Sequence, residues 1–345
     1  MYNELQSMRD LLQKSLRAIL ILTAVVAALC VLFALSFFAW TKHLIEQEAA
    51  LKNDVLLTPQ EPFPVSVQVL QHRIIEDPTV DWYVETYLSF NQDNSRQAQW
   101  LDQMLAQVAK WDWYQQLASS VSRILVIYSG ERREQVVANF GDILKWTDEE
   151  RVLFTEYIQA TEPYLEDGTF YPGRYVVPSD ASPELVADLL HERFVNEVLA
   201  RYTPEVEAQV PLKDALIIAS LLEREAYDFT DMRYISGIIW NRLFIDMPLQ
   251  LDATLQYARG GVANAWWPRV VPNDKFIESP YNTYENAGLP PAPIANPSVE
   301  SIMAALNPRV TPCMFYFHDT DGRFYCTKTY GEHVAKLKEI YGQGQ

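Results

Sequence analysis

Positive charge is in short supply in this sequence: 28 lysine and arginine residues stand against 45 aspartates and glutamates, which gives a net charge of −17 at pH 7. A protein so acidic repels the phosphate backbone of nucleic acids, and no run of basic residues makes a local exception. We therefore expect no nucleic-acid partner. A hydrophobic content of 49% over 345 residues excludes a disordered chain and leaves room for about two domains.

Cysteine is scarce too, because Cys30, Cys313 and Cys326 are the only three. Their spacing lacks the paired C-x-x-C form of structural zinc sites, so the sequence predicts no metal. The peptidase motifs H-E-x-x-H and G-x-S-x-G are absent as well. A peptidase is therefore the weakest of the functions considered, and we expect His318 and His333 to be structural or solvated.

One long segment, residues 18–40, has no charged side chain at all. An apolar helix of this length matches the hydrocarbon core of a bilayer, about 30 Å, and exceeds the apolar run of most signal peptides. A signal peptide with a weak cleavage site at 34–36 is the alternative. Arg9, Lys14 and Arg17 precede the segment, which favours a cytoplasmic amino terminus. We expect a single-pass inner-membrane protein with a periplasmic body.

The sequence beyond this segment predicts an α+β protein in two parts. A β-branched run over 123–128, followed by a helical pattern over 131–144, indicates a compact strand–helix unit. A stretch rich in proline and glycine follows, and Ser182-Pro183-Glu184 then has the pattern of a helix start. The expected parts are a cytoplasmic tail over 1–17, the membrane helix over 18–40, a linker over 41–64, a membrane-proximal module over 65–175 and a mainly helical domain over 176–345.

Two carboxylates end a predicted helix over 212–226, whose middle is apolar almost all the way round and so indicates burial. Glu223 and Glu225 are separated by about 200° around the helix axis, so both cannot face one cleft. The residues that share a stripe with Glu223 are Leu216, Ala219 and Ser220. We predict that Glu223 points inward.

Burial would raise the pKa of the Glu223 carboxyl, as a general acid near neutral pH requires. The alternative is a structural ion pair between Glu223 and Arg224, Arg233 or Arg242. Downstream, Gln250, Asp252 and Thr254 either line a cleft or form turns and helix caps. A Pro-rich loop over 279–297 carries amide and phenol side chains that suit neutral sugars.

These stretches together resemble a known family, the endolytic murein transglycosylases or YceG-like proteins. The resemblance is strong over 212–337 and weaker over 123–202. The sequences that carry it, in order, are ALIIASLLEREA, ISGIIWNRL, MPLQLDATLQY, SPYNTYENAGLPPAPIANPSVESIMAALNP and FYFHDTDGRFYCTKTYGEHVAKL. One departure is Ala253, which stands where family members commonly have proline.

The resemblance implies a membrane-anchored lyase with a LysM-like α+β subdomain and a mainly helical catalytic domain that ends in a β-hairpin. Its substrate would be the nascent glycan strands of peptidoglycan, with peptidoglycan synthases as further partners and no cofactor or metal. The motif ASLLERE places the family's catalytic glutamate on Glu223. The glycan-contacting positions would be Gln250, Tyr281, Asn282, Thr283 and Tyr284.

A lytic transglycosylase can work with one carboxyl, whereas ordinary glycosidases use two. In the implied reaction, Glu223 protonates the glycosidic oxygen of the MurNAc-GlcNAc β-1,4 bond and then accepts the proton of the C6 hydroxyl. That hydroxyl attacks C1 and leaves a 1,6-anhydro-MurNAc end. A membrane-tethered scaffold that binds peptidoglycan without cutting it is the alternative.

The last part of the sequence predicts a hairpin, with strands over 315–317 and 323–327 around the turn Asp321-Gly322. Cys313 and Cys326 are expected on one face of it. In an oxidising periplasm they either form a disulfide or remain two small unpaired residues, and the sequence leaves both readings open.

Overall fold

The computed structural model describes residues 61–76, 78, 81, 122–160, 167–261, 263 and 265–342, together with Leu32, Ser36 and Ala39. The predicted tail over 1–17, most of the membrane helix over 18–40 and most of the linker over 41–64 lie outside the described residues. Among the helices of the described ranges, none is both long and apolar enough to cross a bilayer. The anchor and its orientation therefore stay predictions.

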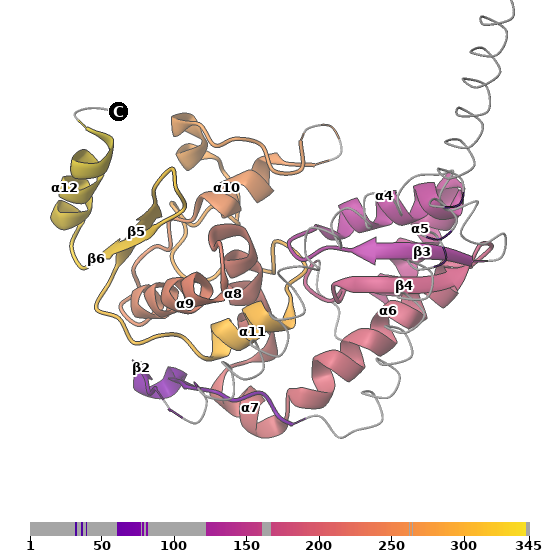
Figure 1. Ribbon diagram of the computed structural model, residues 1–345, viewed down its shortest axis with the longest axis horizontal. Helices are drawn as coiled ribbons and strands as arrows, with labels where there is room; N and C mark the ends of the chain where they lie inside the picture. The colour runs from indigo at the N-terminus through magenta and orange to yellow at the C-terminus, as the bar shows by residue number, and fades with distance from the viewer. Residues whose placement is uncertain are drawn as a thin grey trace, which may run out of the picture. The chain divides into compact units, whose positions relative to one another are not determined.

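A compact unit of two strands and two helices occupies residues 122–178 (Figure 1). Its elements in chain order are β3 (Ser122–Ile127), α4 (Arg133–Leu144), α5 (Asp148–Gln159) and β4 (Gly173–Pro178). The strands pair antiparallel, with Leu125 opposite Tyr175. Phe140 and Phe154 project from the helices into the core beneath them. The predicted strand–helix unit is present, and its LysM-like character stays a prediction.

A second core is mainly helical and is centred on α8 (Leu212–Glu225). Residues 215–222 of α8 are all buried, as its apolar sequence predicts, because neighbouring helices cover it on several sides. Asp228 and Ser298 cap the helices that follow. The other elements around this core are α7 (Pro204–Gln209), α9 (Phe229–Leu243), α10 (Asp252–Arg259) and α11 (Val299–Leu306), with short 3-10 helices at Leu199–Arg201 and Pro272–Phe276.

The two cores share elements from both sides of the predicted boundary between 175 and 176, which stays a prediction. Helix α6 (Pro183–Glu197) buries Leu190 in the core of the strand–helix unit and Phe194 in the helical core. Phe63 and Val67, from the predicted linker and membrane-proximal module, also belong to the helical core. A long amphipathic helix such as α6 can pack against two cores and so contribute to both.

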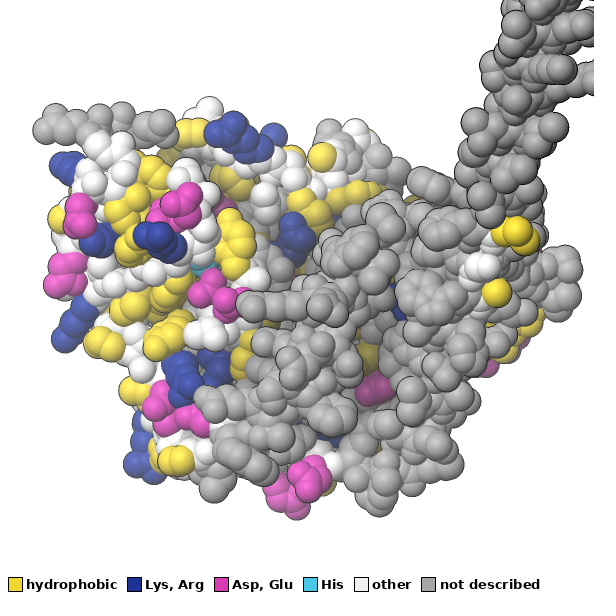
Figure 2. Space-filling view, in the orientation of Figure 1, with side chains coloured by type: hydrophobic (Ala, Val, Ile, Leu, Met, Phe, Trp, Pro, Cys, Tyr) yellow, Lys and Arg dark blue, Asp and Glu magenta, His cyan; other side chains and the backbone are white. Residues whose placement is uncertain are grey.

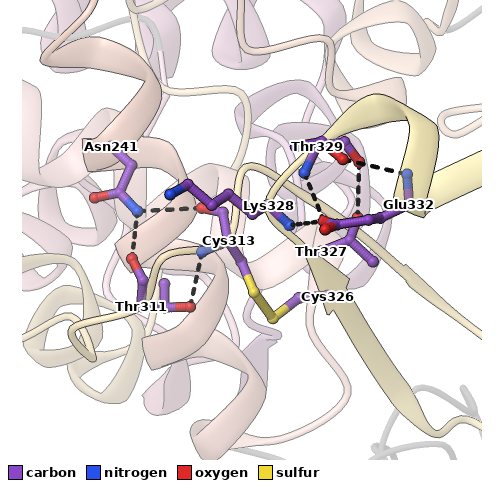
Figure 3. Close-up of a disulfide and its surroundings, with 8 residues drawn as sticks. All are labelled: Asn241, Thr311, Cys313, Cys326, Thr327, Lys328, Thr329 and Glu332. Atoms are coloured by element: carbon purple, nitrogen blue, oxygen red, sulfur yellow. Dashed lines mark hydrogen bonds between the residues drawn. A yellow bond between two sulfur atoms is a disulfide. The ribbon is translucent and has the colours of Figure 1, made fainter.

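The predicted C-terminal hairpin forms from β5 (Phe315–His318) and β6 (Phe324–Thr327), with α12 (Tyr330–Tyr341) after it. Of the two alternatives for the cysteines, the structure has the bridge, because Cys313 and Cys326 form a disulfide (Figure 3). The side-chain amide of Asn241 in α9 donates to the carbonyl oxygen of Cys313, at 3.1 Å. The hairpin is thereby joined to the helical core.

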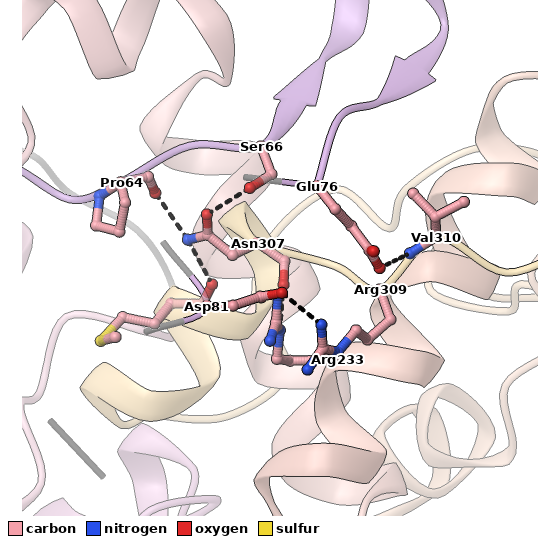
Figure 4. A network of polar contacts seen from close by, with 9 residues as sticks. Pro64, Ser66, Glu76, Asp81, Arg233, Asn307, Arg309 and Val310 are labelled. Carbon is pink, nitrogen blue, oxygen red and sulfur yellow. Dashed lines mark hydrogen bonds and ion pairs between the residues drawn. The ribbon is translucent and has the colours of Figure 1, made fainter. Parts of the chain in front are cut away.

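A polar network attaches the segment 61–81 to the helical core (Figure 4). Asp81 pairs with both Arg233 and Arg309, each at 2.6 Å. Burial would raise the pKa of Asp81, but the hydrogen bonds and charges of these two arginines hold it below its usual value. Asn307 accepts from the Ser66 hydroxyl at 2.9 Å. Distant parts of the sequence are therefore fixed around α9 and α11.

Charged side chains of both signs are interspersed with hydrophobic ones on the described part of the face in Figure 2. The net charge of −17 is therefore not gathered there into a single acidic field. Local arrangements of side chains, rather than a general surface potential, must distinguish a site on this face.

Candidate functional site

A cavity of about 690 Å³ lies at the carboxyl end of α8, where the hairpin and two loops meet. Acidic and basic side chains line it, and aromatic rings form much of the rest of its surface. The polar lining residues are Glu225, Arg242, Gln250, Asp252, Lys275, Tyr284, Tyr316, His318 and His333, and the aromatic ones include Phe315, Phe317 and Tyr330. Such a mixture of hydrogen-bonding groups and flat apolar rings suits a saccharide.

Glu225 is the carboxylate that α8 delivers to this cavity. Its Oε2 accepts a hydrogen bond from the Tyr316 hydroxyl at 2.8 Å, and its Oε1 accepts from the backbone N–H of Ala253 at 3.3 Å. Burial raises the pKa of Glu225, and these two hydrogen bonds only partly oppose that effect. The carboxyl is therefore held in position and keeps its proton to higher pH than an exposed glutamate, as a general acid must.

Glu223 lies on another side of the same helix and is not among the residues that line this cavity. Its Oε1 accepts from the backbone N–H of Ser298, at 2.8 Å, at the start of α11. Two of the arginines predicted as alternative partners are engaged elsewhere: Arg233 pairs with Asp81, and Arg242 donates to the carbonyl oxygen of Met314. The geometry thus places Glu223 against the start of α11 rather than on this cavity wall, and its role as the general acid stays a prediction.

Gln250 and Tyr284 are the predicted substrate-binding residues that do line the cavity. Gln250 has a φ of 51°, in the left-handed region that non-glycine residues seldom adopt, and its N–H donates to the carbonyl oxygen of Thr283 at 3.0 Å. Such a conformation costs on the order of 1–3 kcal/mol and is found most often at functional sites. The loop therefore holds Gln250 in a strained backbone conformation at the cavity wall.

Asn282 and Thr283 do not line the cavity, so their predicted role as glycan contacts has no support from this geometry and stays a prediction. Their exposed fractions are 0% and 2%, and their polar atoms are used within the protein. The Asn282 side-chain amide donates to the carbonyl oxygens of Lys275 and Ile277, at 3.0 and 2.9 Å. The Thr283 hydroxyl accepts from the N–H of Leu251 at 3.0 Å. Both residues hold the loops that carry the lining residues.

Tyr281 is also absent from the cavity wall, and its ring packs against Tyr257 with centroids 4.7 Å apart. Asp252, in contrast, is a lining residue, and its carboxylate accepts from the Tyr284 hydroxyl at 2.7 Å. Burial and this carboxylate raise the pKa of Tyr284, so the phenol stays protonated. Asp252 and Tyr284 therefore form a hydrogen-bonded pair in the same cavity lining as Glu225.

Sequence reasoning missed Glu225, Arg242, Lys275 and Tyr316 as lining residues. Burial lowers the pKa of Arg242, yet its guanidinium remains charged and donates to backbone carbonyls. In the described part of the chain, no group of three or more histidine, cysteine, aspartate or glutamate side chains could hold a metal ion. A second cavity, about 510 Å³ and lined by residues 276–280, Glu285 and Asn286, has only exposed carboxylates.

The model of the YceG-like family matches residues 65–339, which is more than half of the chain. The chain belongs to the YceG-like family. A solved YceG-like protein from Listeria monocytogenes shares the fold, with a TM-score of 0.52 and 29% identity over 62% of this chain and 75% of that one. The family match therefore covers the helical core, the candidate cavity and the hairpin.

Curated relatives of this YceG-like chain bear the name endolytic murein transglycosylase. The protein from Bacillus subtilis is 35% identical over 178 residues, which are 51% of this chain and 48% of the relative. The protein from Streptococcus pneumoniae is 29% identical over 178 residues, 51% of this chain and 32% of the relative. The chain thus spans a half or less of the length of these relatives.

Proposed function

We propose that this protein is a peptidoglycan lytic transglycosylase in which Glu225 is the general acid and then the general base. The observation that carries the proposal is the half-buried side chain of Glu225, whose carboxyl is held by Tyr316 and Ala253 on the wall of an open cavity with sugar-compatible side chains. The names of the relatives from Bacillus subtilis and Streptococcus pneumoniae support the same substrate and reaction.

In the first step, protonated Glu225 gives its proton to the oxygen of the MurNAc-GlcNAc β-1,4 bond. The bond between that oxygen and C1 of MurNAc breaks, and positive charge develops on the MurNAc ring. Burial raises the pKa of Glu225, which favours the protonated form that this step requires. The GlcNAc end leaves with a neutral hydroxyl.

In the second step, the Glu225 carboxylate accepts the proton of the C6 hydroxyl of the same MurNAc. The freed oxygen attacks C1 and closes the 1,6-anhydro ring, so no water is consumed and Glu225 is protonated again. Asp252 supplies negative charge toward the developing cation, with its carboxylate oriented by Tyr284. The Gln250 amide, on the same wall, is placed to bind a sugar hydroxyl or acetamido group.

The rest of the proposed function concerns location. We infer that residues 18–40 anchor the protein in the inner membrane with a cytoplasmic amino terminus, and that the cavity acts on nascent strands in the periplasm. The uncharged sequence of that segment and the basic residues before it support this arrangement. We also propose that the strand–helix unit over 122–178 is a LysM-like subdomain that binds glycan.

The test is product analysis with the full chain. Purified protein is incubated with murein sacculi, and released fragments are identified by mass spectrometry. We expect 1,6-anhydro-MurNAc ends from the wild type and none from Glu225→Gln. Reducing ends instead of anhydro ends would contradict the lyase reaction. Binding to sacculi without any cleavage would replace it with the scaffold function.

A further inference from the structure

The carboxyl of Glu225 is held by two segments that are distant in the sequence. One is the start of α10, where the Ala253 N–H donates, and the other is β5, where the Tyr316 hydroxyl donates at 2.8 Å. Burial raises the pKa of Tyr316 well above its usual value, and the charge of Glu225 raises it further. Tyr316 therefore stays protonated and remains a donor toward the carboxylate.

Tyr316 belongs to a small element that needs support. Its hairpin is a two-stranded sheet with four residues in each strand, and an isolated two-stranded hairpin is marginally stable. Before β5, the chain is fixed to α9: Asn241 donates to the carbonyl oxygens of Thr311 and Cys313, at 2.8 and 3.1 Å. The support continues along β5, because Arg242 of α9 donates to the carbonyl oxygen of Met314 at 2.8 Å and His318 is joined to Asp231 at 2.9 Å.

The disulfide extends this support to the partner strand (Figure 3). Cys326 lies directly opposite Tyr316 in the register of β5 and β6, so their side chains share one face of the hairpin. Because Cys313 is fixed to α9, its bond to Cys326 fixes the strand that pairs with Tyr316. One cysteine of the disulfide is thus the cross-strand partner of the donor that positions Glu225.

We propose that Tyr316 is a positioning residue for Glu225 and that the Cys313–Cys326 disulfide keeps Tyr316 in place, so that the oxidised protein cuts glycan faster than the reduced one. The proposal rests on the proposed function of Glu225. Formation of the bridge removes two electrons and two protons from the two thiols, and a disulfide of a thiol oxidant takes them up and becomes a dithiol. The cutting activity would rise when the chain enters an oxidising compartment.

Other titratable groups face the same cavity and stay in the pH profile of every form of the protein. Asp252 is on α10, Arg242 is on α9, Lys275 is in the 3-10 helix Pro272–Phe276, Tyr284 is on a loop, His318 is on β5 and His333 is on α12. His318 is also joined to Asp231 of α9 at 2.9 Å, which gives it a support of its own. A shift of the pH profile that occurs only when Tyr316 or the disulfide is changed can therefore be distinguished from the titrations of these other groups.

The first test replaces the donor alone. In Tyr316→Phe we expect kcat to fall about tenfold, with KM within about twofold, because a hydrogen bond to a charged group is lost. That bond favours the carboxylate, so its loss raises the pKa of Glu225 and moves the alkaline limb of the rate profile to higher pH. Tyr325→Phe is the matched control: Tyr325 lies opposite Phe317 in the register and donates to Asp319.

The second test removes the bridge. We expect dithiothreitol, or the Cys313→Ala/Cys326→Ala double variant, to reproduce the loss of kcat and the shift of the alkaline limb. Reduction of Tyr316→Phe should add no further loss, because both changes act through one contact. Losses that multiply, or a reduced wild type with unchanged kcat and pH profile, would overturn the proposal. Circular dichroism of each form checks that the chain remains folded.

A measurement without substrate separates this proposal from the proposed function. The pKa of Glu225 is read by ¹³C NMR of glutamate-labelled protein, with Glu225→Gln to assign the signal. We expect a higher pKa in reduced protein and in Tyr316→Phe than in oxidised wild type, and equal values in all three would overturn the proposal. Oxidised wild type that does not cut murein would instead sink the proposed function, whatever the NMR shows.

Discussion

Glu223 and Glu225 lie on one helix, two residues apart, yet their surroundings differ completely. Glu223 accepts a backbone N–H at the start of α11, which joins two helices of the core. Glu225 lines an open cavity, where burial raises its pKa and a tyrosine of the hairpin orients it. The comparison teaches that helical position alone does not decide the role of a carboxylate. The partners that the rest of the fold brings to it decide.

The largest expected difference between the two sides of α8 is in activity. We expect Glu225→Gln to lower the rate of glycan release by about a thousandfold, because proton transfer in both steps is lost. The matched variant Glu223→Gln, which removes the same charge two residues away, should keep the rate within about threefold. Release of muropeptides from sacculi measures both. A larger loss in Glu223→Gln than in Glu225→Gln would reverse the comparison.

Asp167, a buried carboxylate outside the cavity, tests whether a raised pKa is enough to make an acid catalyst. Asp167 is 2% exposed and accepts from the Tyr257 hydroxyl at 2.9 Å. Burial, and secondly the charge of Glu134, raises its pKa to about 7. Between about pH 4 and pH 7 the unfolded chain loses this proton and the folded chain keeps it, so stability decreases as pH rises through that window.

We therefore expect Asp167→Asn to flatten the pH dependence of the unfolding free energy between about pH 4 and pH 7, measured by urea titration. Its rate of glycan release at neutral pH should stay within about threefold of the wild type, because Asp167 does not line the cavity. An unchanged pH dependence of stability would show that Asp167 is not the titrating group. If Asp167→Asn lost as much activity as Glu225→Gln, a carboxylate outside the cavity would be as important for catalysis as one that lines it, which would contradict this account.

Stability should show the opposite pattern from activity. Glu223→Ala removes an acceptor from the Ser298 N–H and a negative charge near the amino end of α11, and we expect it to lower the unfolding free energy by about 1 kcal/mol. Glu225→Gln should cause no loss of stability, because a desolvated carboxyl is replaced by a neutral group. Denaturant midpoints measure both, and a destabilised Glu225→Gln would contradict this account.

The smallest expected effect comes from relieving the backbone strain at Gln250, on the cavity wall. Gln250 has a φ of 51°, which glycine adopts freely, so Gln250→Gly should raise the unfolding free energy by about 0.5 to 1 kcal/mol. If the Gln250 amide binds a sugar, the same variant has a higher KM with kcat little changed. A stabilised variant with an unchanged KM would leave Gln250 as a purely structural position of the loop.

The sequence predicted the elements of the site better than its side-chain assignments. The buried run in α8 and the hairpin at Asp321-Gly322 follow from local pattern, and both are present. Which of Glu223 and Glu225 faces the cavity does not follow from local pattern, because each lies at the end of an apolar stripe. The residues three, four and seven positions before Glu225 are Leu222, Leu221 and Ile218. Only the long-range partners Tyr316 and Ser298 distinguish the two stripes.

The loop over 279–286 shows a second limit of pattern reasoning. Asn282 and Thr283 are polar residues next to tyrosines, which made them candidates for glycan contact, yet both are buried. A local signal did exist for Asn282, whose side-chain oxygen accepts from the N–H two residues on, a turn pattern that asparagine favours. For Thr283 no such signal exists, because its partners Leu251 and Thr254 are about thirty positions away.

The most direct test of the central claim is a crystal structure of the Glu225→Gln protein with a bound glycan strand. The account predicts that the glycosidic oxygen of one MurNAc-GlcNAc bond lies within about 3.2 Å of the side chain at position 225, with the saccharide in the cavity beside Tyr284 and Tyr316. A saccharide bound against Glu223, or in the second cavity beside Phe276, would contradict it.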